Sequence, residues 1–118
     1  MQVQWVKNST NGQWFDLLRL NLSAPYFIDK FGVYVIWYSS PGSSRVIRVG
    51  QGDISSRLKE HSSNPEIMKY SQYGQLKVAW AIIDPRYADG VEAFLFDTYQ
   101  PLIGERKPAA QPIPVNLI

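Results

Sequence analysis

The chain has 118 residues, of which 45% are hydrophobic and 14% aromatic, and this is enough apolar material for the core of one domain. It contains no cysteine, which excludes disulfides, thiolate zinc sites and thiol chemistry. The formal net charge of +2 is compatible with a phosphate-rich partner but does not require one, because acidic and basic residues are interspersed. There is no apolar segment of the kind found in secretory signals or membrane spans, so we expect a soluble, cytoplasmic protein without membrane contact.

We interpret residues 1–118 as a single domain with three parts. Residues 1–30 form an N-terminal extension that should pack on the core through its tryptophans, and its secondary structure is left open between helix and strand. Residues 31–104 carry the regular patterns described below. Residues 105–118 are rich in proline, and we expect an extended tail with a short edge strand at its end.

A β-hairpin followed by a helix is predicted first. Residues 32–38 (GVYVIWY) are apolar on both alternating faces, as in a strand that is covered on both sides. Residues 44–50 predict a second strand, and the Ser/Pro/Gly segment between the two makes the pair a hairpin. Asp53 is a favourable N-cap for a helix over about residues 54–62.

A third strand and a second helix follow. Residues 76–83 (LKVAWAII) predict the strand, and Asp84 with Pro85 provides the N-cap and first position of the helix, which Pro101 should end. Helical spacing gives this helix a predicted core face of Val91, Phe94, Leu95, Thr98 and Leu102.

The order strand, strand, helix, strand, helix predicts an α+β fold. We expect a small three-stranded, mostly antiparallel sheet flanked by helices. Ile54 and Leu58 should anchor the first helix to this sheet, because they form one apolar stripe at helical spacing.

Five side chains on these elements carry the types needed to cut a phosphodiester. Across the hairpin, Tyr34 should lie opposite or nearly opposite Arg48. Helical spacing places Arg57 and His61, the only histidine, on one face of the first helix. Glu92 lies among apolar neighbours, where a carboxylate has no packing role. A carboxylate can bind Mg²⁺, a guanidinium can offset charge on phosphorus, and a phenol or imidazole can move a proton.

The order and spacing of these motifs resemble those of the GIY-YIG nuclease domain family. The resemblance covers about residues 31–104 and rests on GVY at 32–34, RVG at 48–50 and the strings VGQGDISSRLKEH and EAFLFDTYQPLIG. It implies a three-stranded antiparallel sheet flanked by helices, which agrees with the fold predicted above. It also implies a Mg²⁺-dependent endonuclease that hydrolyses DNA at a site holding one Mg²⁺ or Mn²⁺.

The resemblance also implies roles by position. Tyr34 matches the first-motif tyrosine that activates or positions the attacking water, and Arg57 matches the arginine that contacts the scissile phosphate. His61 occupies a position where the family carries histidine or tyrosine, and Glu92 matches the single carboxylate that binds the metal. Together with Arg48 and Arg57, we expect Lys59 and Asn116 to contact the nucleic acid.

The sequence departs from the family pattern at two positions. Arg48 replaces the second-motif tyrosine, a candidate general base, and Gly104 replaces an asparagine whose role we assign to Asn116 in the tail. Three consequences of Arg48 stay open. In the first, its guanidinium favours the phenolate of Tyr34 and so lowers the pKa of that group; in the second, it clamps a phosphate; in the third, it marks a site that has lost catalysis.

Two functions therefore compete: the endonuclease, and a catalytically degenerate module that keeps the fold and binds nucleic acid. A structural role without nucleic acid is a third interpretation. Each residue also has an ordinary role, such as packing for Tyr34, solvation for Arg57 and Lys59, and complementing a helix dipole for His61 and Glu92. Specificity for DNA would come from the loops of the domain, from a homodimer, or from a partner protein.

Overall fold

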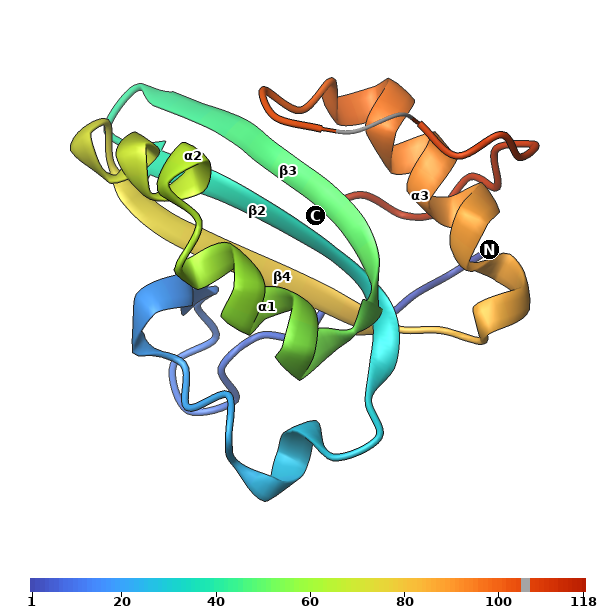
Figure 1. The fold of residues 1–118 in the computed structure, drawn as a ribbon, viewed down its shortest axis with the longest axis horizontal. Helices are drawn as coiled ribbons and strands as arrows, with labels where there is room; N and C mark the ends of the chain where they lie inside the picture. Colours follow the sequence, from blue (N-terminus) through green and yellow to red (C-terminus); the bar gives the residue numbers. More distant parts are fainter. Residues whose placement is uncertain (105–106) are drawn as a thin grey trace.

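A four-stranded antiparallel sheet organises the protein, whose computed structural model describes residues 1–104 and 107–118 (Figure 1). The strands are β1 (Phe15–Asp16), β2 (Phe31–Ser40), β3 (Ser43–Asp53) and β4 (Gln75–Ile82). Their order across the sheet is β1-β4-β2-β3, so β3 is an edge strand. The α+β class is confirmed, but the prediction of three strands is wrong, because the N-terminal extension adds β1 beside β4.

The β2–β3 hairpin has a tighter turn and a different register from those predicted. Only residues 41–42 separate the two strands, and a β-bulge shifts the pairing between Ile36 and Trp37. As a result Tyr34 pairs with Gly50, and Arg48 pairs with Ile36. Arg48 therefore lies two residues from the position directly opposite Tyr34, and the pairing keeps both side chains on the same face of the sheet, as predicted for a nearly opposite pair.

The first helix has the bounds expected from its sequence. Helix α1 (Ile54–Ser62) begins after Asp53, whose carboxylate accepts a hydrogen bond from the backbone N–H of Ser56 at 3.0 Å. Ile54 and Leu58 are fully buried against the sheet, as their spacing predicted. The short helices that surround it were not predicted: η1 (Leu17–Arg19), η2 (Pro25–Phe27), α2 (Pro65–Met68) and η3 (Lys69–Gln72).

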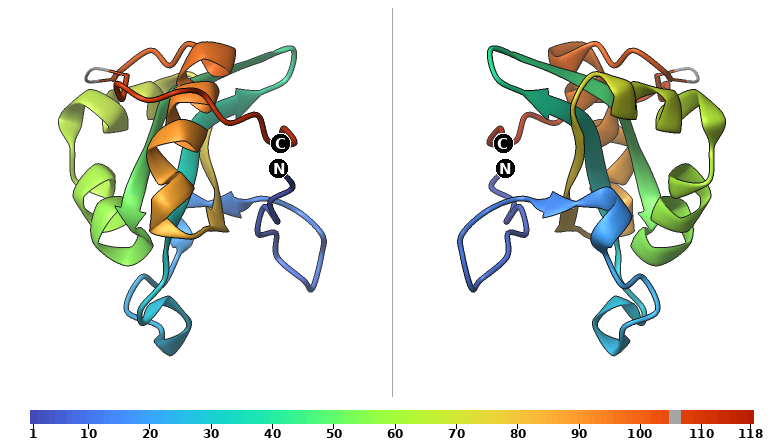
Figure 2. Two further views of the ribbon diagram at one scale, coloured as in Figure 1. Left: turned by 90° about the vertical axis from the view of Figure 1, so that its right-hand side faces the viewer. Right: turned by 90° about the vertical axis from the view of Figure 1, so that its left-hand side faces the viewer.

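Helices cover both faces of the sheet, and this divides the core into two layers (Figure 2). Helices α1 and α2 pack on the face that carries Tyr34 and Trp80. Helix α3 (Pro85–Tyr99) packs on the opposite face, where Val91 and Leu95 meet the inner side chains of β2 and β3. Because β3 lies at the edge of the sheet, α1 and α3 can approach each other around it.

The predicted core face of α3 is correct for its first turns and wrong for its end. Val91 and Leu95 are buried and Phe94 packs against them, but Thr98 and Leu102 are exposed. The helix ends at Tyr99, because the next residue has a left-handed backbone and a proline follows it. Leu102 consequently lies outside the helix.

After α3 the chain runs back along β3 and then returns to the N-terminus. The backbone N–H groups of Leu102 and Ile103 donate to the carbonyl groups of Val46 and Ile47 at 3.1 and 2.8 Å. The predicted tail strand is absent from the described residues 107–118, and the first two residues of the predicted tail lie outside the described part of the chain. In this described stretch of the tail, the Pro114 carbonyl accepts from the N-terminal amine at 3.1 Å, so the two ends of the chain lie together (Figure 2).

In the described parts of the chain, none of the helices has both the length and the apolar character that crossing a bilayer requires.

Candidate functional site

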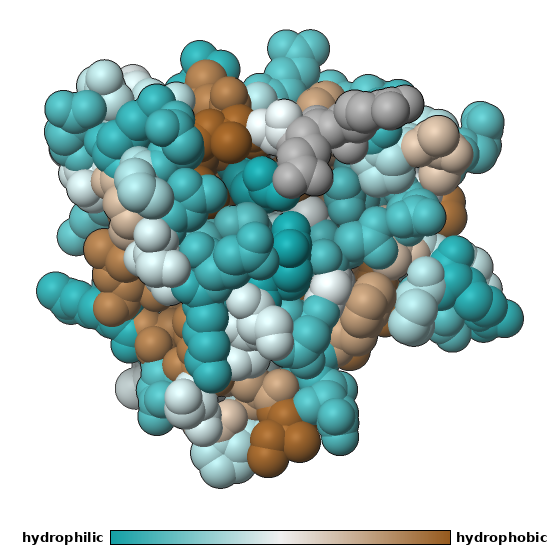
Figure 3. All heavy atoms as spheres, viewed as in Figure 1, coloured by the Kyte–Doolittle hydropathy of each residue, from teal (hydrophilic) through white to brown (hydrophobic). Residues whose placement is uncertain are grey.

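A small cleft of about 170 Å³ opens at the free edge of β3, just beyond the segment that covers Val46 and Ile47. Its lining residues are Arg48, Val49, Gly50 and Gln51 from β3, Arg57 from α1, Glu92 and Phe96 from α3, and Gly104. The space-filling view shows hydrophilic side chains in the middle of this face, where β3 passes between α1 and α3 (Figure 3). The edge position of β3 therefore lets groups from both helical layers line one cleft.

Arg57 enters the cleft from the first full turn of α1, whose start is fixed by the Asp53 cap. Gly52 has a φ of 141° and lies against the arginine stem, since a Cβ at this position would be 2.9 Å from the Cγ of Arg57. The guanidinium contacts the Glu60 carboxylate at 3.1 Å, and both side chains are partly exposed. Such an ion pair is weak, so an anion in the cleft can compete for the Arg57 guanidinium.

Arg48 is half-buried and presents an incompletely satisfied donor. Its Nε is buried and makes no hydrogen bond to any residue within 1–104 or 107–118. Leaving a buried donor without an acceptor costs about 1–3 kcal/mol. Arg48 also lines the cleft, so its positive charge lies beside any anion that binds there.

Glu92 faces the two arginines from α3. Burial raises the pKa of the Glu92 carboxyl, and Asp89 adds to this, while a hydrogen bond from Gln51 and the charges of Arg48 and Arg57 oppose it. Gln51 also donates to the Asp89 carboxylate at 2.6 Å. The net effect of these surroundings is therefore to disfavour the charged form of Glu92, and the neighbouring donors only reduce this effect.

The donor set of the cleft fits Mg²⁺ better than a metal that needs several protein ligands. No group of three or more His, Cys, Asp or Glu side chains positioned for a metal occurs among the residues that the structure describes. Mg²⁺ is commonly bound through one or two carboxylates, with waters and substrate phosphate oxygens as its other ligands. Glu92 could supply the one carboxylate, and the neighbouring arginines could hold the phosphate.

Tyr34 and His61 form a buried pair directly beside the cleft. The Tyr34 hydroxyl lies 2.6 Å from Nε2 of His61, and the two side chains are 0% and 2% exposed. Neither lines the cleft, but Gly50 does, and a Cβ on Gly50 would meet the Tyr34 hydroxyl and lie 2.5 Å from its Cζ. Both side chains are therefore closed to solvent, and the backbone at Gly50 covers the phenol.

The environment of His61 makes the stability of the protein depend on pH. Burial, with smaller contributions from the charges of Arg48 and Arg57, lowers the pKa of His61 to about 4, from about 6.5 in an unfolded chain. Between these values the unfolded chain binds the proton and the folded protein does not. Stability from this group is thus complete above pH 6.5 and falls as the pH approaches 4, by up to about 3 kcal/mol.

We expect the His61→Gln variant to lose this component of the pH dependence. Urea unfolding at several pH values between 6.5 and 4 measures the free energy of unfolding of both proteins. The wild type should lose stability more steeply than the variant over this range. Parallel curves for the two proteins would show that His61 is not held neutral in the folded state.

Lys59 and Asn116 lie away from the cleft. Lys59 lines a separate groove with Asp53 and Ser55, on the other side of α1. The Asn116 side chain accepts from the backbone N–H of Val3 at 2.7 Å and donates to the Val3 carbonyl at 2.9 Å. The assignment of Asn116 to the site is therefore wrong: its amide joins the two ends of the chain, where extended backbone needs hydrogen-bond partners.

Sequence reasoning missed Phe96 and Gln51, which line the cleft, and Asp89, which contacts Gln51. Phe96 follows Glu92 by four residues, so helical spacing places both on one face of α3, and this signal was available. Asp89 precedes Glu92 by three residues and was available in the same way. Gln51 has no local signal, because its contact with Asp89 joins β3 to α3.

Comparison of the chain with protein-family models, with curated proteins and with solved structures gave no match.

Proposed function

We propose that this protein is a Mg²⁺-dependent endonuclease that hydrolyses DNA phosphodiester bonds at the β3 cleft, in the manner of GIY-YIG nucleases. The supporting observation is that Arg48, Arg57 and Glu92, from three different elements, line one cleft of about 170 Å³. Two cations beside a single carboxylate suit a phosphodiester and one hard cation, Mg²⁺ or Mn²⁺.

The two arginines would bind the scissile phosphate. A guanidinium matches the geometry of phosphate oxygens and makes two parallel hydrogen bonds to them. Arg48 lines the cleft from β3, and Arg57 sits on the first full turn of a capped helix. Their positive charge would stabilise the extra negative charge that develops on phosphorus as water attacks.

Glu92 would hold the metal from the α3 side of the cleft. A bound Mg²⁺ supplies Lewis-acid activation and lowers the pKa of water in its coordination shell. Glu92 supplies the carboxylate, and Gln51 restrains the neighbouring Asp89 through its 2.6 Å hydrogen bond. This hydrogen bond keeps the second carboxylate near the cleft in a fixed orientation.

Tyr34 and His61 would act as positioning residues, because neither side chain reaches the cleft. Their 2.6 Å hydrogen bond joins β2 to α1 beneath Gly50. It would fix the distance between the strand that carries Arg48 and the helix that carries Arg57. The low pKa of His61 keeps this pair neutral at pH 7, so it adds no further positive charge beneath the two arginines.

A module that binds nucleic acid without cutting it is the second candidate. It is favoured by the burial of Tyr34 and His61 and by Arg48 at the position of the second-motif tyrosine, since among the described residues these leave no tyrosine or histidine in the lining of the cleft. Such a module should bind DNA equally well with Mg²⁺ or EDTA. Its affinity should fall linearly with salt on a logarithmic plot.

DNA cleavage with Mg²⁺ tests the endonuclease directly. Purified protein is incubated with supercoiled, linear, single-stranded and branched DNA, with Mg²⁺ or with EDTA, and the products are separated on gels. We expect Mg²⁺-dependent nicking, and we expect Arg57→Ala to lower its rate about 100-fold, the effect typical of removing one donor to the transition-state charge.

Arg86→Ala is a matched control, because Arg86 is exposed and pairs with Asp84 at the start of α3, outside the cleft. This variant should cut at the wild-type rate. Absence of cleavage on every substrate, or equal rates for wild type and Arg57→Ala, would exclude the endonuclease. Binding that persists in EDTA without cleavage would favour the second candidate.

A further inference from the structure

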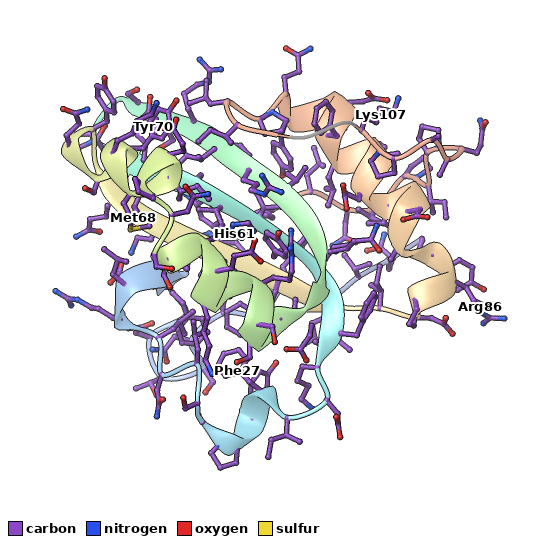
Figure 4. The ribbon with its side chains drawn as sticks, viewed as in Figure 1. Phe27, His61, Met68, Tyr70, Arg86 and Lys107 are labelled. Atoms are coloured by element: carbon purple, nitrogen blue, oxygen red, sulfur yellow. The ribbon has the colours of Figure 1, made fainter. Side chains whose placement is uncertain are left out.

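Three tyrosines form an aromatic cluster at the hairpin end of the sheet. Tyr38 comes from β2, Tyr70 from η3, and Tyr73 follows η3. Their ring centroids are 5.7 to 6.2 Å apart, and the rings of Tyr38 and Tyr70 are nearly parallel. Figure 4 shows Tyr70 near this end of the molecule, on the face that also displays His61 and α1.

Tyr38 and Tyr70 pack against the core from one side, and the rest of the cluster is exposed. Tyr73 is 55% exposed, and Tyr38 and Tyr70 are partly exposed. Within residues 1–104 and 107–118, none of the three hydroxyl groups makes a hydrogen bond to another residue. The rings therefore present aromatic surface to solvent without a hydrogen-bonding role inside the protein.

Positive charge borders the cluster. Arg45 pairs with Tyr38 across the hairpin and is exposed, and it also lines a groove with Trp37 and Tyr99 on the α3 side of the sheet. The Lys69 Nζ lies 5.5 Å from the centre of the Tyr70 ring, and it pairs with Glu66 at 3.1 Å. Aromatic faces beside cations are the combination with which proteins bind single-stranded nucleic acid.

The cluster and the cleft lie at two places along β3. The register places Arg45 and Arg48 on the same side of this strand, opposite Tyr38 and Ile36. Three residues along a strand span about 10 Å. Residues 102 and 103 hydrogen-bond to Val46 and Ile47 along this stretch, so a polyanion bound at Arg48 would pass over them to reach Arg45 and the tyrosines.

An open groove continues beyond the cluster. Tyr73 lines this groove, whose volume is about 980 Å³, together with the end of β2, the start of β4 and Arg19. Its size is at the upper end of the range for pockets that hold small organic ligands. The surface next to the tyrosines thus has room for bases that leave the cleft along β3.

We propose that Tyr38, Tyr70 and Tyr73, with Arg45, form a binding site for unpaired bases of single-stranded nucleic acid that flanks the phosphate in the cleft. This inference deepens the proposed function, on which it rests for the position of that phosphate. Stacking on the tyrosine rings needs bases whose faces are free, so paired bases inside a duplex cannot use the site. The protein should therefore prefer DNA with a single-stranded or frayed segment next to the cleaved bond.

Binding of a short fluorescein-labelled oligothymidylate, measured by fluorescence anisotropy in EDTA, tests the site without relying on cleavage. We expect Tyr73→Ala to weaken binding about tenfold, and Tyr73→Phe to bind as the wild type does, because stacking needs the ring and not the hydroxyl. Arg45→Ala should also weaken binding and lower the slope of log K against log salt by about 0.7.

Tyr87→Ala is the matched control, because Tyr87 is 37% exposed and lies 5.0 Å from the Arg86 guanidinium, on α3. It should leave binding unchanged, and blunt duplex DNA should not respond to Tyr73→Ala. Equal losses for Tyr73→Ala and Tyr87→Ala, no loss for either Tyr73→Ala or Arg45→Ala, or no binding by the wild type would overturn the site. Circular dichroism checks that each variant is folded.

The two proposals fail in different ways in these experiments. Oligothymidylate binding that depends on Tyr73 and Arg45, without cleavage of any DNA, would support the base-binding site and exclude the endonuclease. Mg²⁺-dependent cleavage with wild-type oligothymidylate binding by Tyr73→Ala and Arg45→Ala would support the endonuclease and exclude the base-binding site.

Discussion

Glu92→Gln is expected to lower the rate of Mg²⁺-dependent DNA nicking by at least about 100-fold and to strengthen DNA binding in EDTA. The amide has nearly the same shape but cannot replace a carboxylate that holds Mg²⁺, and Lewis-acid activation is worth several kcal/mol. The same change removes the negative charge that faces Arg48 and Arg57. Both guanidiniums then act on the phosphate without a competing anion in the cleft.

The opposite signs of these two effects make the experiment decisive. A variant that is merely unfolded would lose binding and cleavage together, whereas a variant without the metal ligand should lose cleavage alone. Asp97→Asn is a matched control on the same helix, because Asp97 pairs with Lys107 at the surface and does not line the cleft. Wild-type cleavage by Glu92→Gln, or weaker DNA binding in EDTA, would contradict the assignment of Glu92.

The elements that could be predicted from sequence are those fixed by neighbouring residues. The bounds of α1 follow from the Asp53 cap and the apolar stripe of Ile54 and Leu58, all within six residues. The start of α3 follows in the same way from Asp84 and Pro85. Capping and amphipathic spacing act locally, so the sequence pattern is sufficient for them.

The features that were missed depend on contacts between distant residues. β1 forms because Phe15 pairs with Val78 in β4, and no sequence pattern around Phe15 indicates this pairing. The short turn moves the hairpin register by one residue, and the bulge at Ile36 and Trp37 moves it by another. Together they place Gly50, and not Arg48, opposite Tyr34.

The candidate site likewise combines residues that local motifs identify with features that depend on distant contacts. Arg57 and Glu92 were identified by position in recognisable motifs, and the structure brings both to one cleft. The burial of Tyr34 and His61 beside them could not be predicted, because it depends on the backbone of Gly50 and on the packing of α1 against β2. Asn116 is the clearest case in which local sequence patterns were insufficient, because its hydrogen-bond partner Val3 lies at the other end of the chain.

Gly50→Ala is expected to lower the free energy of unfolding by about 3 kcal/mol, although it adds a single methyl group. The new Cβ would lie 2.5 Å from Cζ of Tyr34 and still closer to the hydroxyl, so the ring or the strand must shift. Overpacking of this kind costs about 1–3 kcal/mol. The shift also breaks the buried hydrogen bond to His61, which costs about 1–3 kcal/mol more.

A double-mutant cycle measured by urea unfolding separates this clash from a general effect on β3. In a Tyr34→Leu background the ring and its hydroxyl are gone, so Gly50→Ala should cost less than about 1 kcal/mol there. Ser44→Ala, at an exposed position of the same strand, should change stability by less than about 0.5 kcal/mol in both backgrounds. If Gly50→Ala lowers the free energy of unfolding equally with and without Tyr34, the Tyr34 ring is not the reason why glycine occupies this position. A strong coupling would show instead that the glycine at this position of the motif makes room for the Tyr34–His61 pair beneath the cleft.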